Sequence, residues 1–233
     1  MKVLHIITRM NTGGPAVFLD HLTKSMADLG TKSIIAYGYC ESNETDYTDT
    51  HKLNADLIRV KSLHRSLSPI SDIRSFFQLR KIIKTQKPDL VNTHTSKAGV
   101  LARLATKSVN GRTPVVHTFH GHLIYGYFAR YKSFVFTLIE KIMSRFTNVA
   151  VAVTAETKNS LTKLGIGRNL PWRVIQIGIP VRVVRQTTAA EQTFKLLWIG
   201  RFTPIKDPSL AVKVIKNLSN AGQERFKLTM VGE

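Results

Sequence analysis

The basic residues with the clearest chemical context lie in WIGRFTPIKDPSLAV, residues 198–212. Arg201 directly follows an apolar strand pattern, and Lys206 stands five residues later, just before a helical pattern that begins near Pro208. A guanidinium offers a planar pair of donors to a phosphate, and a lysine beside a helix N-terminus adds a compact positive charge. Two basic residues in a loop are commonly just solvated, so it is the strand-to-helix position that favours a phosphate site here.

Histidines gather at the end of another strand pattern, in HTFHGH, residues 117–122. Open parallel sheets bind their ligands at such strand ends, and side-chain alternation turns His117 away from His120. We assign His120 as the candidate catalytic residue, acting as a general base or a substrate contact, and a structural histidine is the alternative. A zinc ligand is less favoured, because no nearby cysteine or second ligand cluster supports it. We assign His122, and His94 at the end of NTHTSKAG, to acceptor or sugar binding.

A glycine pair follows the first strand pattern in NTGGPA, residues 11–16. At Gly13 and Gly14, backbone N–H groups can approach an anion at a helix N-terminus, where the helix dipole also favours negative charge. The segment is neither a Walker A nor a GxGxxG sequence, so it supports neither a simple NTPase nor an NAD-binding protein. A glycine pair can also serve only to shape a turn, and the pattern alone leaves both interpretations open.

The elements that must position these residues alternate between short apolar runs and helical patterns, which is typical of βαβ units on a parallel sheet. We expect strands at residues 3–8, 32–39, 89–94, 114–120, 149–154 and 173–178. We expect helices at residues 15–30, 73–86, 97–109, 134–146 and 156–165. The predicted fold class is therefore α/β, with a Rossmann-like, doubly wound parallel sheet.

The domain organisation changes after this series. Residues 182–193 are polar and lack a clear period, so we predict a linker between a first domain, residues 1–181, and a second unit, residues 194–233. That second unit reads as strand, helix and strand, and one βαβ unit cannot cover both faces of its own strands. The sequence therefore predicts an incomplete, truncated second Rossmann-like domain.

Composition points to anionic partners, because 34 Lys and Arg stand against 15 Asp and Glu for a formal net charge of +19. Such a balance favours anionic lipid, phosphorylated substrates or nucleic acid, although the basic residues can also form a solvated surface that only keeps the protein soluble. We predict no nucleic-acid partner, because we find no zinc-ligand spacing, RNP-like aromatic residues or basic repeat. The single cysteine, Cys40, allows no disulfide within the chain, and no apolar run fits a signal peptide or a membrane span. We therefore predict a cytoplasmic protein.

Five segments, taken in order, resemble the family 4 glycosyltransferases of GT-B fold, in particular those that build bacterial capsule, exopolysaccharide or lipopolysaccharide: MKVLHIITRMNTGGPAVFLDHL, DLVNTHTSKAGVLARLA, VVHTFHGHLIYGYF, VAVTAETKNSLTKLGI and WIGRFTPIKDPSLAV. The resemblance implies two facing Rossmann-like domains, with the acceptor bound mainly by the first and the nucleotide-sugar mainly by the second. It also implies hexosyl transfer with retained anomeric configuration, and neither a metal nor another cofactor.

The resemblance also implies roles for individual residues. Gly13 and Gly14 would line the cleft beside the donor's phosphate or the acceptor. His120 corresponds to the strand-end histidine that contacts the transferred sugar. Arg201 and Lys206 correspond to the basic pair that holds the donor's diphosphate, where they would neutralise the charge of the departing nucleotide.

The function that the resemblance implies is transfer of a sugar from a nucleotide-sugar to a polysaccharide or lipid-linked acceptor. Family members continue past the MVGE at which this sequence stops, and QIGIP, residues 176–180, lacks their usual asparagine. We therefore expect impaired activity in the 233-residue chain. A second interpretation is a non-catalytic half of a split or degenerate glycosyltransferase. This half would bind an acceptor or the anionic inner face of the plasma membrane, with a separately encoded C-terminal half as its partner.

Overall fold

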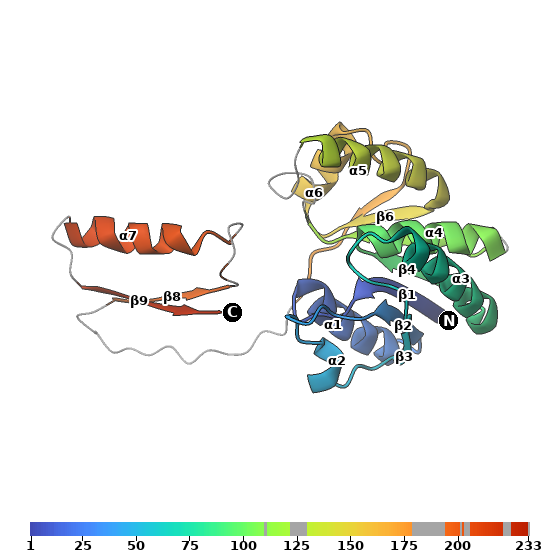
Figure 1. The fold of residues 1–233 in the computed structure, drawn as a ribbon, viewed down its shortest axis with the longest axis horizontal. Coiled ribbons are helices and arrows are strands. Elements are labelled where there is room, and N and C mark those ends of the chain that lie inside the picture. The colour runs from blue at the N-terminus through green and yellow to red at the C-terminus, as the bar shows by residue number, and fades with distance from the viewer. Residues whose placement is uncertain are drawn as a thin grey trace. The chain divides into compact units, whose positions relative to one another are not determined.

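The computed structural model describes residues 1–109, 111–121, 130–178, 194–200, 202, 206–220 and 225–232. Contacts between Cα atoms divide the chain into two compact units, Met1–Pro180 and Val181–Glu233 (Figure 1). The first carries the histidines and the glycine pair, and the second carries Lys206.

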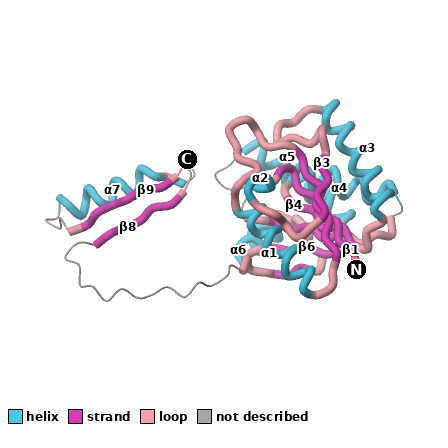
Figure 2. The backbone as a smooth tube through the Cα atoms, turned by 90° about the horizontal axis from the view of Figure 1, so that it is seen from below, coloured by secondary structure: helices cyan, strands magenta, loops and turns pink. Residues whose placement is uncertain are grey.

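The first unit is built on one seven-stranded sheet whose strand order is β3-β2-β1-β4-β5-β6-β7. All of its strand pairs are parallel, and helices cover both faces of the sheet (Figures 1 and 2). The strands are β1 (Lys2–Arg9), β2 (Lys32–Gly38), β3 (Asp56–Arg59), β4 (Leu90–His94), β5 (Val115–Phe119), β6 (Val149–Ala152) and β7 (Trp172–Val174). The helices are α1 (Gly14–Asp28), α2 (Tyr47–Thr50), α3 (Pro69–Gln86), α4 (Ser96–Val109), α5 (Arg130–Met143), the short 3-10 helix η1 (Ser144–Phe146) and α6 (Ala155–Lys163).

Local sequence signals explain where the helices begin and end. Prolines stand in the first turns of α1 and α3, where the missing N–H has no intrahelical partner to lose. Helix α3 ends at Lys87, which adopts a left-handed backbone conformation (φ 46°) immediately before Pro88. Thr154 caps α6 by accepting a hydrogen bond from the backbone N–H of Thr157.

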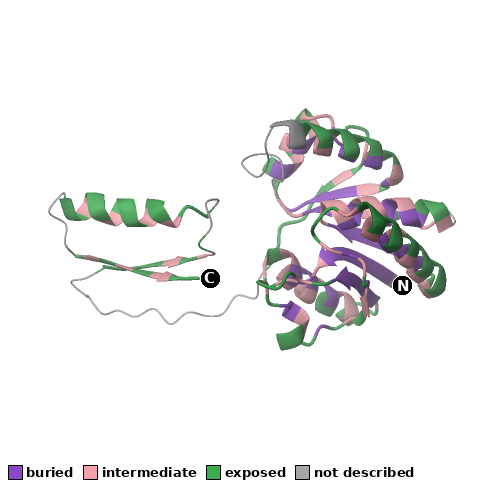
Figure 3. Ribbon diagram, viewed as in Figure 1, coloured by how far each residue is buried: buried purple, intermediate pink, exposed green. Residues whose placement is uncertain are grey.

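The hydrophobic core lies on both sides of the sheet, as expected for strands buried on both faces. The face covered by α3 and α4, here called the α4 face, contains Leu4 and Ile6 of β1 packed with Leu79 of α3 and Ala102 of α4. The opposite face, here called the α1 face, includes Ile7, Ile35 of β2 and two residues of α1, Ala16 and Leu19. Figure 3 shows this buried layer running through the centre of the unit. Consecutive side chains of β1 therefore enter different environments.

The predicted α/β class with a doubly wound parallel sheet is confirmed. Two short elements, β3 and α2, were not expected from the sequence, because segments of four residues carry little periodic signal. Helix α5 begins before the predicted residue 134, and β7 covers only Trp172–Val174 of the region predicted as 173–178. The observed boundaries therefore differ from the predicted ones by a few residues, whereas the order of the larger elements is as predicted.

The second unit contains β8 (Phe194–Ile199), α7 (Pro208–Asn220) and β9 (Phe226–Val231). The two strands pair in parallel, with Phe194 opposite Phe226 and Ile199 opposite Val231. None of the described side chains of this unit is buried, and Leu197 and Ile199 are 62% and 73% exposed. The predicted linker, residues 182–193, lies outside the described residues, and the completeness of this domain stays a prediction.

Candidate active site

The candidate site lies at the carboxyl ends of the central strands of the first unit. Strand order reverses between β1 and β4, since the chain runs from β1 to β2 and β3 on one side and from β4 to β5 on the other. Open α/β sheets bind ligands in the crevice at this reversal. His94 is the last residue of β4, His120 follows β5, and the pair Gly13–Gly14 forms the N-cap and first residue of α1, the helix after β1. The topology therefore brings three predicted segments to one edge.

Three imidazoles form a continuous series on the α1 face, here called the histidine row: His5, His94 and His120. His94 Nδ1 lies 2.9 Å from His120 Nε2, and His94 Nε2 lies 3.4 Å from His5 Nδ1. His5 and His94 are completely buried, whereas His120 is half-buried. Phe18 of α1 packs its ring edge against His94 and His120. The row thus runs from the sheet interior to the strand end.

The rings of the histidine row are neutral at pH 7. Burial lowers the pKa of His5 and the pKa of His120 to about 4 in each case. Burial also lowers the pKa of His94 well below 6.5, helped by the neighbouring His120 and His5. A neutral imidazole carries one N–H donor and one acceptor nitrogen. His5 Nε2 and His120 Nδ1, the two ends of the row, have no hydrogen-bond partner among the described residues.

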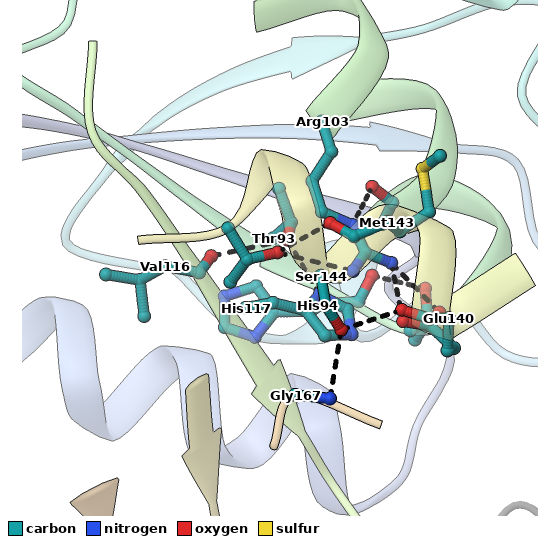
Figure 4. Close-up of polar contacts among 12 residues, drawn as sticks. Thr93, His94, Arg103, Val116, His117, Glu140, Met143, Ser144 and Gly167 are labelled. Carbon is teal, nitrogen blue, oxygen red and sulfur yellow. Dashed lines mark hydrogen bonds and ion pairs between the residues drawn. The ribbon is translucent and has the colours of Figure 1, made fainter. Parts of the chain in front are cut away.

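The α4 face holds a separate polar cluster around His117, as strand alternation predicted. His117 Nδ1 lies 2.7 Å from the Thr93 hydroxyl, and the ring packs closely over Gly99 of α4. Its pKa is held well below 6.5, first by burial and then by the positive charge of Arg103. His117 is therefore a buried, hydrogen-bonded residue of the packing layer (Figure 4).

An ion pair between α4 and α5 completes this cluster. Arg103 Nη2 donates to both carboxylate oxygens of Glu140 at 2.9 Å, and both side chains are 1% exposed. Arg103 Nε also donates to the Gly99 carbonyl at 2.9 Å, and Figure 4 shows the guanidinium between α4 and Glu140. Burial raises the pKa of Glu140, and pairing with Arg103 opposes this shift. The pair joins the helices that follow β4 and β5.

The glycine turn leaves open space where side chains would stand. Gly13 caps α1 with an extended backbone (φ 169°), so its conformation does not require glycine. A Cβ at Gly14 would meet no atom within 4 Å, and one at Gly13 would meet its nearest neighbour, Asn11, at 3.8 Å. Packing in the folded protein therefore does not require glycine at either position. The free space beside the N-terminus of α1 would let an anion approach the backbone closely.

Polar contacts that the sequence did not indicate fix the two strand ends beside this turn. The hydroxyls of Thr8 and Thr95 lie 2.6 Å apart, and Thr95 adopts a left-handed backbone conformation (φ 60°) between β4 and α4. Arg9, at the end of β1, forms a two-pronged hydrogen bond with Glu44 and thereby lowers the pKa of that carboxyl. His5 was also missed, because it reads as part of an ordinary buried strand.

The remaining predicted residues are only partly described. Arg201 and His122 lie outside the described residues. Lys206 is exposed just before α7, beside Asp207, whose carboxylate accepts a hydrogen bond from the Leu210 backbone N–H. Lys206 also lines an open hollow of about 350 Å³ between β8 and α7. The roles assigned to these residues stay predictions.

Two kinds of feature are absent from the residues that the structure describes. In this part of the chain, no group of three or more His, Cys, Asp or Glu side chains is arranged to hold a metal ion. No helix there is both long enough and apolar enough to cross a bilayer.

Comparison with known proteins identifies the family to which the chain belongs. The model of glycosyltransferase family 4 matches residues 12–183. The chain is 33% identical over 178 residues to an Escherichia coli UDP-Gal:alpha-D-GlcNAc-diphosphoundecaprenol alpha-1,3-galactosyltransferase, covering 70% of this chain and 44% of that protein. It is 22% identical over 233 residues to a Campylobacter jejuni alpha-1,4-N-acetyl-D-galactosaminyltransferase whose named substrate is a diphosphoundecaprenol-linked saccharide, covering 100% of this chain and 62% of that protein. The chain thus spans less than half the length of the Escherichia coli relative.

Solved structures agree on the fold. Anabaena Alr3699/HepE, solved in complex with UDP-glucose, superimposes with a TM-score of 0.69 at 15% identity, covering 100% of this chain and 70% of that one. The lipopolysaccharide outer core galactosyltransferase WaaB, in its apo form, gives a TM-score of 0.66 at 13% identity, covering 99% of this chain and 68% of that one. Both are similar to this chain in the arrangement of their elements.

Proposed function

Because the chain belongs to glycosyltransferase family 4, we propose that it serves the transfer of a sugar from a nucleotide-sugar to a polysaccharide or lipid-linked acceptor, with retained anomeric configuration. The observation that carries this proposal is the half-buried His120 after β5, which contacts His94 beside the strand-order reversal between β1 and β4 and has an unpartnered ring nitrogen. Relatives named for transfer to diphosphoundecaprenol-linked saccharides support the acceptor class.

The donor would be held through its diphosphate. In this proposal the N–H groups of Gly13 and Gly14 approach a phosphate or the acceptor, and Arg201 and Lys206 bind the diphosphate. Their positive charges would stabilise the negative charge that develops on the departing nucleotide, as a metal ion does in other transferases. The open space at Gly14 supports a close approach on this side.

The sugar would be contacted by histidines from the first unit. His120 is proposed to bind the transferred sugar, and His122 to bind the acceptor or sugar. Direct binding by His94 was predicted, but both its ring nitrogens contact other imidazoles. We therefore propose that His94 acts through His120.

A transfer assay tests this function and separates it from the alternative. The 233-residue chain is incubated in detergent with radiolabelled UDP- and GDP-sugars and a GlcNAc-diphosphate-lipid acceptor. A labelled product that keeps the anomeric configuration of its donor and falls about 100-fold or more in His120→Ala would support the proposal, whereas a product of inverted configuration would contradict retention. Acceptor binding by folded chain, without a product from any donor, would favour the non-catalytic half with a separately encoded partner.

One surface of the first unit supports contact with an anionic membrane, whether the chain is an active transferase or a non-catalytic half. Helix α5 exposes five large apolar side chains over about two turns, between 38% and 70% each: Phe134, Val135, Leu138, Ile139 and Ile142. Lys141 and Arg145 are exposed beside them, and the whole chain carries a net charge of +19. An apolar helix face flanked by basic residues suits the interface of an anionic bilayer. We therefore propose peripheral binding at the cytoplasmic face of the plasma membrane.

Vesicle flotation tests this surface. The chain should float with anionic vesicles at low salt, less with neutral ones, and progressively less as salt rises. Phe134→Ser with Leu138→Ser should reduce flotation. A matched control, Leu29→Ser with Leu67→Ser, removes side chains that are 82% and 86% exposed outside α5 and should not reduce it. Equal loss in both pairs would contradict a specific role for α5.

A further inference from the structure

The acidic side chains of α3 and α5 are both paired with α4. The only acid of α3 is Asp72, and the only acid of α5 is Glu140. Asp72 forms an ion pair with Lys97, and Glu140 forms one with Arg103. Both cations belong to α4, which contacts α3 and α5. The outward faces of α3 and α5 are therefore left with apolar and basic side chains.

The outward face of α3 carries an apolar stripe. Ile70, Ile73 and Phe77 follow one another at helical spacing and are between 59% and 68% exposed. The outward face of a surface helix is normally polar, so this stripe is unusual. Four cations are exposed on the same helix: Arg74, Arg80, Lys81 and Lys84.

Helix α5 reverses the ordinary distribution of side chains even more clearly. Its buried side chains, among those that the structure describes, are Glu140 and Met143, whereas five large apolar side chains from Phe134 to Ile142 are exposed. A surface helix normally turns its apolar side toward the core. Exposed apolar surface of this extent is typical of a contact with a membrane or another macromolecule. Figure 3 shows the exposed residues along both helices.

We infer that the outward faces of α3 and α5 together form one docking surface for an anionic bilayer. This inference rests on the peripheral binding proposed for α5 and adds α3 as a second contact. The apolar side chains would enter the bilayer interface, and the cations would meet lipid phosphates. A second copy of the chain fits this surface less well, because it would bring the same cations and no outward acid from these helices.

Docking through this surface would fix how the first unit faces the bilayer. The surface lies on the α4 face, whereas the histidine row lies on the α1 face, so docking leaves the candidate site uncovered. Both helices follow a strand of the parallel sheet and therefore begin at its carboxyl edge. Ile70, in the first turn of α3, thus lies toward the same edge as the site. Under the proposed function, a lipid-linked acceptor would approach that edge from the bilayer surface.

Vesicle flotation of a pair of variants tests the contribution of α3. Ile70→Ser with Phe77→Ser should lower partitioning into vesicles of equal parts phosphatidylcholine and phosphatidylglycerol by about tenfold or more. The control Leu29→Ser with Leu57→Ser changes side chains that are 82% and 41% exposed outside both helices, and it should bind like wild type. Circular dichroism would confirm that each pair is folded. Binding of the α3 pair equal to that of wild type would overturn the inference.

Fluorescence quenching would identify the segments that touch the bilayer. The only natural cysteine is removed by Cys40→Ser, and Ile73→Cys, Leu138→Cys or Leu29→Cys then carries a bimane label. Brominated lipid should quench the labels at positions 73 and 138 and leave the label at position 29 unquenched. Quenching at 138 alone would overturn the two-helix surface and retain the α5 contact. Equal quenching at all three positions would show non-specific adsorption and also overturn it.

Two further outcomes separate this inference from the proposals on which it rests. Absence of flotation would refute peripheral binding itself, and the docking surface with it. A dimer in sedimentation that Ile70→Ser with Phe77→Ser dissociates would assign the surface to a second copy instead. Neither flotation nor quenching requires transferase activity. An inactive chain with labels quenched as expected would therefore refute the proposed transfer and retain the docking surface.

Discussion

The two faces of the central sheet treat buried polar groups in opposite ways. On the α4 face, Arg103 and Glu140 form a buried ion pair, in which Arg103 Nη2 donates to both carboxylate oxygens. On the α1 face, the histidine row carries no charge at pH 7, and both its ends lack a partner among the described residues. Complete hydrogen bonding on the α4 face suits a purely structural role, because every buried polar group of the pair has a partner. Incomplete pairing at a strand end suits a site that a ligand completes.

Breaking the charged pair should have the largest effect. Glu140→Leu leaves the Arg103 guanidinium buried without its counter-charge and should lower the free energy of unfolding by about 3–5 kcal/mol. Urea denaturation monitored by circular dichroism would measure this. The double variant Arg103→Met with Glu140→Leu removes both charges and should recover most of the loss. If the double variant were as unstable as Glu140→Leu, packing rather than charge would explain the effect.

Acid should weaken the α1 face through its histidines. The folded-state pKa values of His5 and His120 are about 4, below the ordinary value of 6.5. Between these values the unfolded chain binds protons that the folded chain does not, so stability falls as pH falls. From pH 7 to pH 5 the loss is about 2 kcal/mol for each ring.

Urea midpoints at pH 7 and pH 5 test this expectation. His120→Asn should reduce the pH dependence by roughly one ring's share, about 2 kcal/mol. An identical pH dependence in wild type and variant would show that His120 titrates normally.

A methyl group at Gly99 should disturb the α4 face more than its size suggests. A Cβ there would lie 2.6 Å from Cε1 of His117, whose ring is held by Thr93. Overpacking of this kind costs about 1–3 kcal/mol, which outweighs the gain of about 1 kcal/mol from replacing glycine inside a helix. Thermal unfolding of Gly99→Ala would show a lower midpoint, and a raised midpoint would contradict the close contact.

The matching change on the α1 face should have the smallest effect on stability. Gly14→Ala adds a methyl group in open space and should change the free energy of unfolding by less than about 0.5 kcal/mol. Binding of a nucleotide-sugar, measured by calorimetry, should nevertheless weaken if an anion approaches this turn. Unchanged affinity would contradict the proposed role of Gly14 and leave the fold unaffected.

The sequence predicts the fold better than the site. Long apolar runs such as 3–8 and helical patterns such as 97–109 correctly indicated the larger elements, because their periodicity is local. The histidine row escaped prediction, because His5 and His94 meet only through the pairing of β1 with β4. His5 looked like one more residue of a buried strand. Strand alternation did separate His117 from His120, since that rule needs no knowledge of neighbouring strands.

The pairing of β1 with β4 has a consequence for how the protein folds. The contacts between His5 and His94 and between Thr8 and Thr95 join residues 89 and 87 positions apart. The chain between these residues must close into a long loop before the contacts can stabilise the fold, and the entropy lost in this closure slows folding. The histidine row therefore forms only once this closure is complete, after helices such as α1 and α3 can already have appeared. In refolding followed by NMR, the imidazole signals of the histidine row should therefore be among the last to reach their native positions.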